Sequence, residues 1–235
     1  MKPKAMGTEV ACPLCHSKRT TTVWRENGRE FALCPVCRLV SVPPSYHLDA
    51  GAEVERYLQH ENSLDNAGYV AMFRKKIDIV KQVCMGVDSV LDFGCGPEPV
   101  LKILLQREGY RADAYDPHFF PAWPQRQAWD LIISTETFEH LKQPGAEIEN
   151  LVSRLRPSGY LAIMTRFHSP ARENFSTERF GEWYYKRDPT HIAFFCPETF
   201  AWIAARFHLR IVHDNGTDFV VLQKTNLSSF PVNFC

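Results

Sequence analysis

Four cysteines near the N-terminus have the type and spacing of metal ligands. Cys12 and Cys15 form one C-x-x-C pair, Cys34 and Cys37 form another, and 18 residues separate the two pairs. Zinc prefers thiolate ligands, and two such pairs brought together by a hairpin close a tetrahedron around one ion. Because a closed tetrahedron leaves no open position for a substrate, the pattern predicts a structural Zn²⁺ site.

Residues 89–98 could support a second chemistry, the binding of a nucleotide. An apolar run ends in Asp92, and two closely spaced glycines follow, Gly94 and Gly96. Glycines let the backbone approach a ligand closely, and the next helix begins with unpaired N–H groups. The spacing fits neither the dinucleotide fingerprint nor the phosphate loop. An acid at the turn would repel a pyrophosphate and attract an ammonium group, so a cofactor carrying an amino acid fits better than a plain nucleotide. A strand-to-helix turn without a ligand is the alternative.

The same turn resembles motif I of the class I S-adenosylmethionine-dependent methyltransferases. Residues 90–96 read Val-Leu-Asp-Phe-Gly-Cys-Gly, and Glu98 stands where a third glycine is common. In that family the turn holds the methionine end of the cofactor, which implies roles for Asp92, Gly94 and Gly96. A second acid roughly 20 residues on should bond the ribose hydroxyls. Asp116 is the better-placed acid for that role.

Two further segments extend the resemblance. Residues 129–136 read as the fourth strand of the family, and residues 137–141 resemble the Glu-His-Leu run that follows it in many members. Residues 155–161 resemble the family's Leu-Lys-Pro-Gly-Gly turn, with the next strand beginning at residue 160. Ligands bind at the carboxyl edge of parallel strands, so Thr135 and Glu136 should face the methyl-transfer pocket.

Residues 166–196 form a long segment in which the family usually grips the acceptor. It contains Asp188-Pro189-Thr190-His191, and His191 is our candidate general base because an imidazole titrates near neutral pH. Glu136 is the second candidate for removing a proton. A histidine that only holds the loop is the alternative for His191. The aromatic residues of this segment, either an acceptor pocket or a local core, are Phe175, Phe180, Trp183, Tyr184 and Tyr185.

The stretch before motif I commonly covers the cofactor in the family. Residues 70–84 have apolar side chains at helical spacing, and a polar segment precedes them. Tyr69 is therefore a candidate cofactor contact, and His60 and Asn62 are weaker candidates. A solvated corner between two helices is the alternative.

Residues 117–128 are too short and too rich in proline for the helix, strand and adenine contacts that the family usually places there. Either a strand is lost or reduced, or aromatic residues such as Phe119 and Phe120 build the adenine pocket.

The expected architecture is an α/β, doubly wound, mostly parallel sheet with a closing antiparallel hairpin at residues 209–222, preceded by a small zinc ribbon. The ribbon has β-rich runs at 20–24 and 29–33 around an Asn-Gly turn. The expected division is a zinc ribbon at 1–45, a helical cofactor-covering segment at 46–86, a methyltransferase domain at 87–225 and a tail at 226–235.

Composition limits the possible partners. Lysine plus arginine and aspartate plus glutamate both number 27, so the net charge is zero, which argues mildly against nucleic acid. Residues 1–38 alone have seven basic and three acidic side chains, so the ribbon could touch RNA or a protein. No apolar run reaches membrane-spanning length and the first residues lack a signal peptide's apolar core, so we expect a cytoplasmic protein.

Three functions remain open from the sequence. The first is a methyltransferase that uses S-adenosylmethionine and acts on a small-molecule acceptor, favoured by the aromatic segment and the neutral charge. The second is an RNA or protein methyltransferase whose zinc ribbon docks the macromolecule. The third is a non-catalytic binding module of the same fold. As a whole, the chain resembles bacterial methyltransferases of undefined acceptor that carry an N-terminal four-cysteine ribbon.

Overall fold

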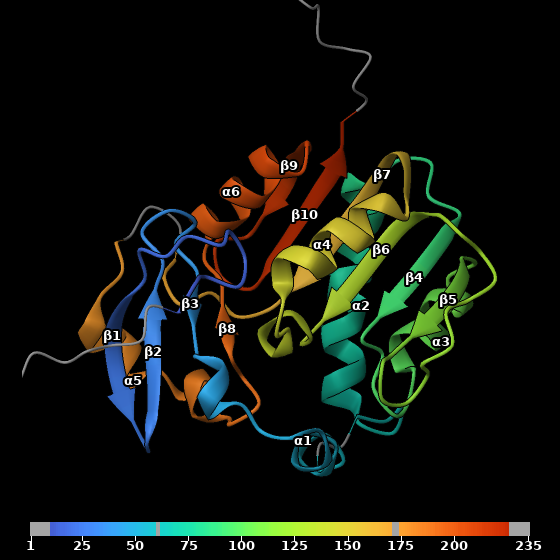
Figure 1. Cartoon of the computed structure of the whole chain (residues 1–235). Coiled ribbons are helices and arrows are strands. Elements are labelled where there is room, and N and C mark those ends of the chain that lie inside the picture. The colour runs from blue at the N-terminus through green and yellow to red at the C-terminus, as the bar shows by residue number, and fades with distance from the viewer. Residues whose placement is uncertain (1–9, 60–61, 171–173, 226–235) are drawn as a thin grey trace, which may run out of the picture.

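The computed structural model describes residues 10–59, 62–170 and 174–225. His60 and the predicted tail at 226–235 lie outside the described residues. The described chain forms two sheets, one of six strands and one of four (Figure 1).

The six-stranded sheet has the predicted mixed topology. Its order is β5-β4-β6-β7-β10-β9; the first four strands are parallel, and β10 runs antiparallel to both of its neighbours, β7 and β9. The chain order reverses between β4 and β6, and ligands bind at such a switch point in open α/β sheets. The strands are β4 (Ser89–Phe93), β5 (Arg111–Tyr115), β6 (Trp129–Thr135), β7 (Leu155–Met164), β9 (Leu209–Asp214) and β10 (Phe219–Lys224).

Helices cover both faces of this sheet, as a doubly wound fold requires. Strand side chains alternate between faces, so Val90 packs with α2 and α3 whereas the adjacent Leu91 packs with α4 and α6. All four helices bury apolar side chains against the sheet. Their bounds are α2 (Ala67–Val83), α3 (Val100–Arg107), α4 (Pro144–Ser153) and α6 (Pro197–Arg206).

The connection between β5 and β6 contains no helix and no further strand of the sheet. Within residues 117–128, all described, the structure has one isolated bridge, between Asp116 and Phe120. The loss of a strand, one of our two predictions for this segment, is confirmed. Trp123, from this connection, stacks on Tyr115 at the end of β5, with ring centroids 3.9 Å apart.

Strand β7 begins earlier than the sequence suggests. We expected a turn over residues 156–159 and a strand from Tyr160, but the strand runs from Leu155. Its pairing with β6 passes from Trp129↔Leu155 directly to Leu131↔Tyr160. The four intervening residues therefore bulge out of the ladder inside the strand and do not precede it.

The four-stranded sheet combines N-terminal strands with one strand from much later in the chain. Strands β1 (Thr21–Glu26) and β2 (Arg29–Leu33) form the predicted hairpin, followed by β3 (Val40–Ser41). The fourth strand, β8 (Ala193–Phe194), comes from the segment at 166–196 and pairs with β3. Figure 1 accordingly shows blue N-terminal strands beside orange ones. The N-terminal segment and the acceptor segment thus fold as one sheet, while the domain boundaries remain predictions.

Short helices surround this second sheet. Four of the five predicted aromatic side chains build a local core against it, with Phe31 and Phe180 packed edge to face at 5.5 Å, whereas Tyr184 is exposed and lines the cavity described below. Across the described residues, no helix is long and apolar enough to cross a membrane. The short helices are η1 (Pro44–Tyr46), α1 (Ala50–Tyr57), η2 (Phe138–His140), α5 (Thr177–Glu182) and η3 (Tyr184–Arg187).

Candidate active site

A cavity of about 1010 Å³ lies at the carboxyl edge of β4, β5 and β6. Its lining combines the motif I turn, the ends of β5 and β6, the helices α1 and α2, and the η3 segment with the loop that follows. The topological switch point of the sheet, the expected ligand site of this architecture, therefore opens into a cavity of a size typical of small-molecule sites.

Two glycines of the turn line the cavity in conformations that favour glycine. Gly94 has φ +76° and Gly96 has φ +68°. A Cβ on Gly94 would lie 2.3 Å from side-chain atoms of Thr137, so the loop after β6 occupies the space that glycine leaves. A Cβ on Gly96 would meet no protein atom within 4 Å, so the open side of the turn faces the cavity.

Asp116 fixes this turn from the end of β5. Its Oδ2 accepts a hydrogen bond from the Gly96 N–H at 3.0 Å, and its Oδ1 accepts from the N–H groups of His118 and Phe119. Oδ1 accepts two hydrogen bonds and Oδ2 only one, so Oδ2 keeps lone-pair capacity, and Asp116 lines the cavity. The second predicted acid therefore lies beside the first predicted turn.

Asp92 lies beneath the turn and not on the cavity wall. Its side chain is buried and accepts a hydrogen bond from the Lys102 N–H, at the start of α3, over 3.2 Å. Burial raises the pKa of Asp92 to about 7. The structure thus brings Gly94, Gly96 and Asp116 together at the cavity and leaves Asp92 behind them.

Thr135 and Glu136 line the cavity at the end of β6, as the sequence predicts. Glu136 adopts φ +49°, a left-handed conformation that costs a non-glycine residue free energy and often marks a functional position. Its Oε2 accepts a hydrogen bond from the Tyr185 hydroxyl at 3.1 Å. Burial, and then the neighbouring Glu139, raise the pKa of Glu136 to about 8.

The sequence analysis did not single out Glu139, which is fully buried behind Glu136. One of its oxygens accepts a hydrogen bond from the same Tyr185 hydroxyl. Glu136, Glu139 and Tyr185 therefore form one polar cluster on the acceptor side of the cavity. The signal that could have found it is the spacing Glu-x-x-Glu directly after a buried strand, which places both acids at the ligand edge.

His191 and His140 form the adjacent wall, with ring centroids 4.8 Å apart. His191 Nδ1 bonds to the backbone carbonyl of Tyr185 at 2.7 Å, so this nitrogen carries the proton and Nε2 is the acceptor. Burial, and then the nearby His140, lower the pKa of His191 to about 3. The ring is therefore neutral near pH 7, and its bond to the backbone also holds the loop.

Helices α1 and α2 cover the cavity. Asn62 and Tyr69 line it, and their contact with a cofactor stays a prediction. On α1, Arg56 donates to Asp188 Oδ2 from Nε at 3.0 Å and from its NH2 group at 2.7 Å. Burial opposes ionisation of Asp188, but the bonds from Arg56 and Thr190 outweigh it and hold the pKa of Asp188 well below its usual range. This pair joins the covering helix to the acceptor loop.

The two phenylalanines predicted for the adenine pocket differ in whether they line the cavity. Phe119 lines the cavity, whereas Phe120 does not and is 38% exposed. Only Phe119 therefore faces the cavity.

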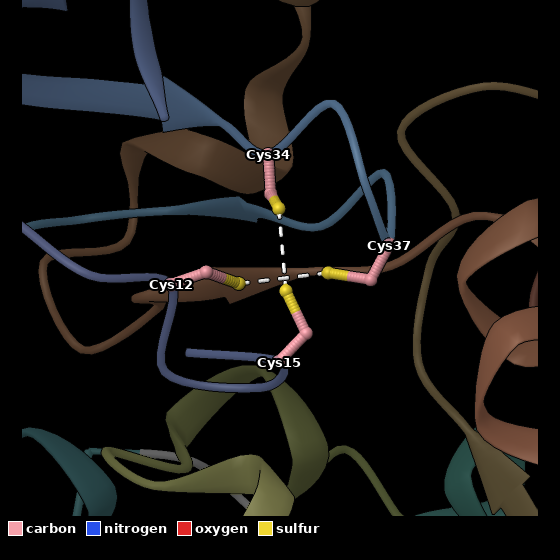
Figure 2. A group of neighbouring side chains, drawn as sticks. All are labelled: Cys12, Cys15, Cys34 and Cys37. Atoms are coloured by element: carbon pink, nitrogen blue, oxygen red, sulfur yellow. Dashed lines mark hydrogen bonds between the residues drawn. The ribbon is translucent and has the colours of Figure 1, made fainter. Parts of the chain in front are cut away.

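The four N-terminal cysteines converge on one point, as Figure 2 shows. The Sγ atoms of Cys12 and Cys37 are 3.5 Å apart, and those of Cys15 and Cys34 are 3.4 Å apart. All four sulfurs lie within 4.8 Å of one another. Zn–S bonds of about 2.3 Å place tetrahedral sulfurs roughly 3.8 Å apart, so the arrangement fits a zinc ion and is closed on all four sides.

Comparisons with known proteins agree with this geometry. Residues 46–214 match the model of the family described as "Methyltransferase domain". The match spans well over half of the chain, so the protein belongs to this methyltransferase family. No curated protein matches the chain.

Solved structures to which this chain is similar include an O-methyltransferase family protein from Burkholderia thailandensis, with 14% identity and a TM-score of 0.46. The match covers 73% of this chain and 62% of that one, less than two thirds of its length. A SAM-dependent methyltransferase from Archaeoglobus fulgidus has 18% identity and a TM-score of 0.47, with 75% of this chain and 100% of that chain covered.

Proposed function

We propose that this protein transfers a methyl group from S-adenosylmethionine to a small-molecule acceptor inside the cavity. One observation carries the proposal: a single cavity is lined on one side by the turn at Gly94 and Gly96 with Asp116, and on the other by Glu136 and His191. Donor and acceptor would therefore meet in one enclosed space.

The cofactor side has the groups that such a donor needs. Gly94 and Gly96 would admit the methionine end, Asp116 has acceptor capacity for ribose hydroxyls, and Tyr69 and Thr135 would close the pocket. When bound, S-adenosylmethionine supplies an electrophilic methyl group. Asp92, one layer below, would make no direct contact.

The acceptor side has groups that bind and hold protons. Methyl transfer is a direct displacement, so the protein contributes chiefly by aligning the nucleophile and excluding water. Glu136 and His191 Nε2 are proton acceptors on this side, and either would serve an acceptor that must lose a proton. The lining carries both signs of charge, including Arg166 and Arg187, which suits a small polar molecule better than a polyanion.

We also propose that the four-cysteine site holds a structural Zn²⁺ ion in a cytoplasmic protein. The sulfurs form a closed, mostly buried set next to apolar residues of the main core. Reduced thiols of this kind are typical of the cytoplasm. The ion would fix the hairpin that supports β8 and, through it, the loop at His191.

The experiment is a transfer assay with S-adenosylmethionine labelled on its methyl group. The purified protein is incubated separately with the small-molecule, RNA and protein fractions of a cell extract, with the Gly96→Ala variant as the inactive control. Label transferred only into the small-molecule fraction supports the proposal. Label in RNA or protein assigns a macromolecular acceptor, and no label in any fraction points to a non-catalytic module.

A further inference from the structure

Three metal-binding side chains meet on the acceptor wall of the cavity, far from the cysteine site in sequence. Glu139 and His140 lie on η2, directly after β6, and His191 comes from the loop before β8. Their potential ligand atoms all lie within 4.8 Å of one another. All three residues line the cavity.

Both histidines are oriented as metal ligands usually are. His140 Nδ1 bonds to the backbone carbonyl of Thr190 at 3.0 Å, and His191 Nδ1 bonds to that of Tyr185 at 2.7 Å. A carbonyl can only accept, so each Nδ1 is protonated and each Nε2 keeps its lone pair. A backbone carbonyl on the second ring nitrogen fixes the tautomer and orientation of metal-ligating histidines.

Glu139 supplies the independent observation. Its side chain is fully buried, and its Oε2 has no hydrogen-bond partner in the part of the chain that the structure describes. Across the same residues, neither Glu139 nor the adjacent Glu136 forms an ion pair with lysine or arginine. A buried carboxylate oxygen without a donor is costly, and a bound cation removes this cost.

We propose that Glu139, His140 and His191 bind a divalent transition-metal cation whose open coordination positions face the cavity. Two imidazole nitrogens and one carboxylate oxygen suit zinc, manganese, iron or cobalt. Bonds of about 2.1 Å place two ligands of a tetrahedral ion roughly 3.4 Å apart. The three ligand atoms, which lie within 4.8 Å of one another, would therefore have to approach one another by up to about 1.4 Å.

The role of the cation site rests on the proposed function, but the binding of a cation there does not. A cation with open positions would bind an oxygen of the acceptor, such as a hydroxyl, and fix it on the acceptor side of the cavity. His191 would then be a ligand and not a base. The cysteine site differs, because its four thiol ligands close around one point and leave no open coordination position for an acceptor.

The test uses the intact protein with its cysteine site loaded with zinc. Mn²⁺ is titrated in, and binding is followed by the loss of the free-ion signal in electron paramagnetic resonance and by the melting temperature. The test variants are Glu139→Gln and His191→Gln, which approximately preserve side-chain size. The matched controls are Glu147→Gln and His118→Gln, because both residues line the same cavity outside the cluster.

The wild-type protein and both controls should bind one Mn²⁺ and melt at a higher temperature in its presence. Each test variant should weaken binding at least about tenfold. If a test variant fails to fold, the other variant and the wild-type titration decide. Failure of the wild type to bind either Mn²⁺ or Co²⁺ below about 1 mM, or equal binding by the folded test variants, would overturn the proposal.

The same samples are titrated with S-adenosylhomocysteine to separate the two proposals. Cofactor binding without Mn²⁺ binding rejects the cation site alone. Mn²⁺ binding without cofactor binding rejects the proposed function alone.

Discussion

The two halves of the cavity are built by different means. On the cofactor side, backbone groups of neighbouring strands set the shape: the Gly94 N–H donates to the Tyr115 carbonyl at 2.8 Å, and the Gly96 N–H donates to Asp116. On the acceptor side, side chains connect distant segments, as Arg56 connects α1 to Asp188. The cofactor half is therefore part of the sheet, whereas the acceptor half depends on contacts that a single substitution can remove.

The N-terminal hairpin is the main support of the acceptor half. The guanidinium of Arg29, on β2, donates to the backbone carbonyls of Lys186, Asp188 and His191. Strand β3 adds the ladder pairing with β8. A loop held by a separate hairpin can lose its support while the turn at Gly96 keeps its own, and this difference can be tested by substitution.

The largest expected effect is the loss of the cysteine site. Cys34→Ser should remove the zinc ion and lower the free energy of unfolding by at least about 3 kcal/mol, because structural zinc contributes folding free energy directly. Metal analysis and thermal melting measure both quantities. Cys84→Ser is the matched control, since Cys84 is buried outside the cluster. A Cys34→Ser protein with full zinc content and unchanged melting would show that the cluster binds no metal.

Arg29→Met should have the next largest effect and lower the free energy of unfolding by about 3 kcal/mol. The change leaves backbone carbonyls of the acceptor loop without donors in a mostly buried place. Hydrogen exchange should increase in residues 184–194 and stay low in β4. The matched control is Arg25→Met on β1, where the side chain is 63% exposed and its pair with Glu30 contributes at most about 1 kcal/mol. Equal losses in the two variants would mean that Arg29 does not support the loop.

Asp92→Asn, in contrast, should raise the free energy of unfolding. Burial holds the pKa of Asp92 at about 7, against an ordinary value of 3.8. Between these values the folded protein keeps a proton that the unfolded chain has released, so this group costs more stability as the pH rises to about 7. Denaturant titration should show the variant more stable by about 2 kcal/mol at pH 8 and by less at pH 5. The exposed Asp88→Asn is the control, and a gain independent of pH would contradict the assignment.

Tyr185→Phe should have the smallest effect and lower the free energy of unfolding by about 1.5 kcal/mol. The change removes the hydroxyl that donates to Glu136 and Glu139. Tyr184→Phe is the matched control, since the neighbouring ring is 57% exposed. Thermal melting of the two variants compares them, and equal melting temperatures would show that the hydroxyl does not stabilise the cluster.

The same contrast explains how far the sequence could be interpreted. The turn at Gly94 and Gly96, the acid at Asp116 and the closing hairpin depend on local spacing and strand periodicity. The structure contains the hairpin and places the turn and the acid at the cavity, while their role in binding a cofactor stays a prediction. Other contacts join residues far apart in the chain, such as the pairing of β3 with β8 and the hydrogen bond between Glu139 and Tyr185. No local sequence pattern indicates these contacts. Asp92 shows a further limit, because spacing identified the residue but not that its side chain points beneath the turn.

The central claim is that the turn at Gly96 faces a cofactor. The most direct measurement is calorimetric titration of the zinc-loaded protein with S-adenosylhomocysteine, comparing Gly96→Ala with Gly86→Ala. Both glycines have φ near +70° and no atom within 4 Å of an added Cβ, so the two variants share the same backbone strain. Micromolar binding by the wild type and Gly86→Ala, weakened at least about tenfold in Gly96→Ala, is the predicted result. Absence of wild-type binding, or equal affinities of the two variants, would contradict the claim.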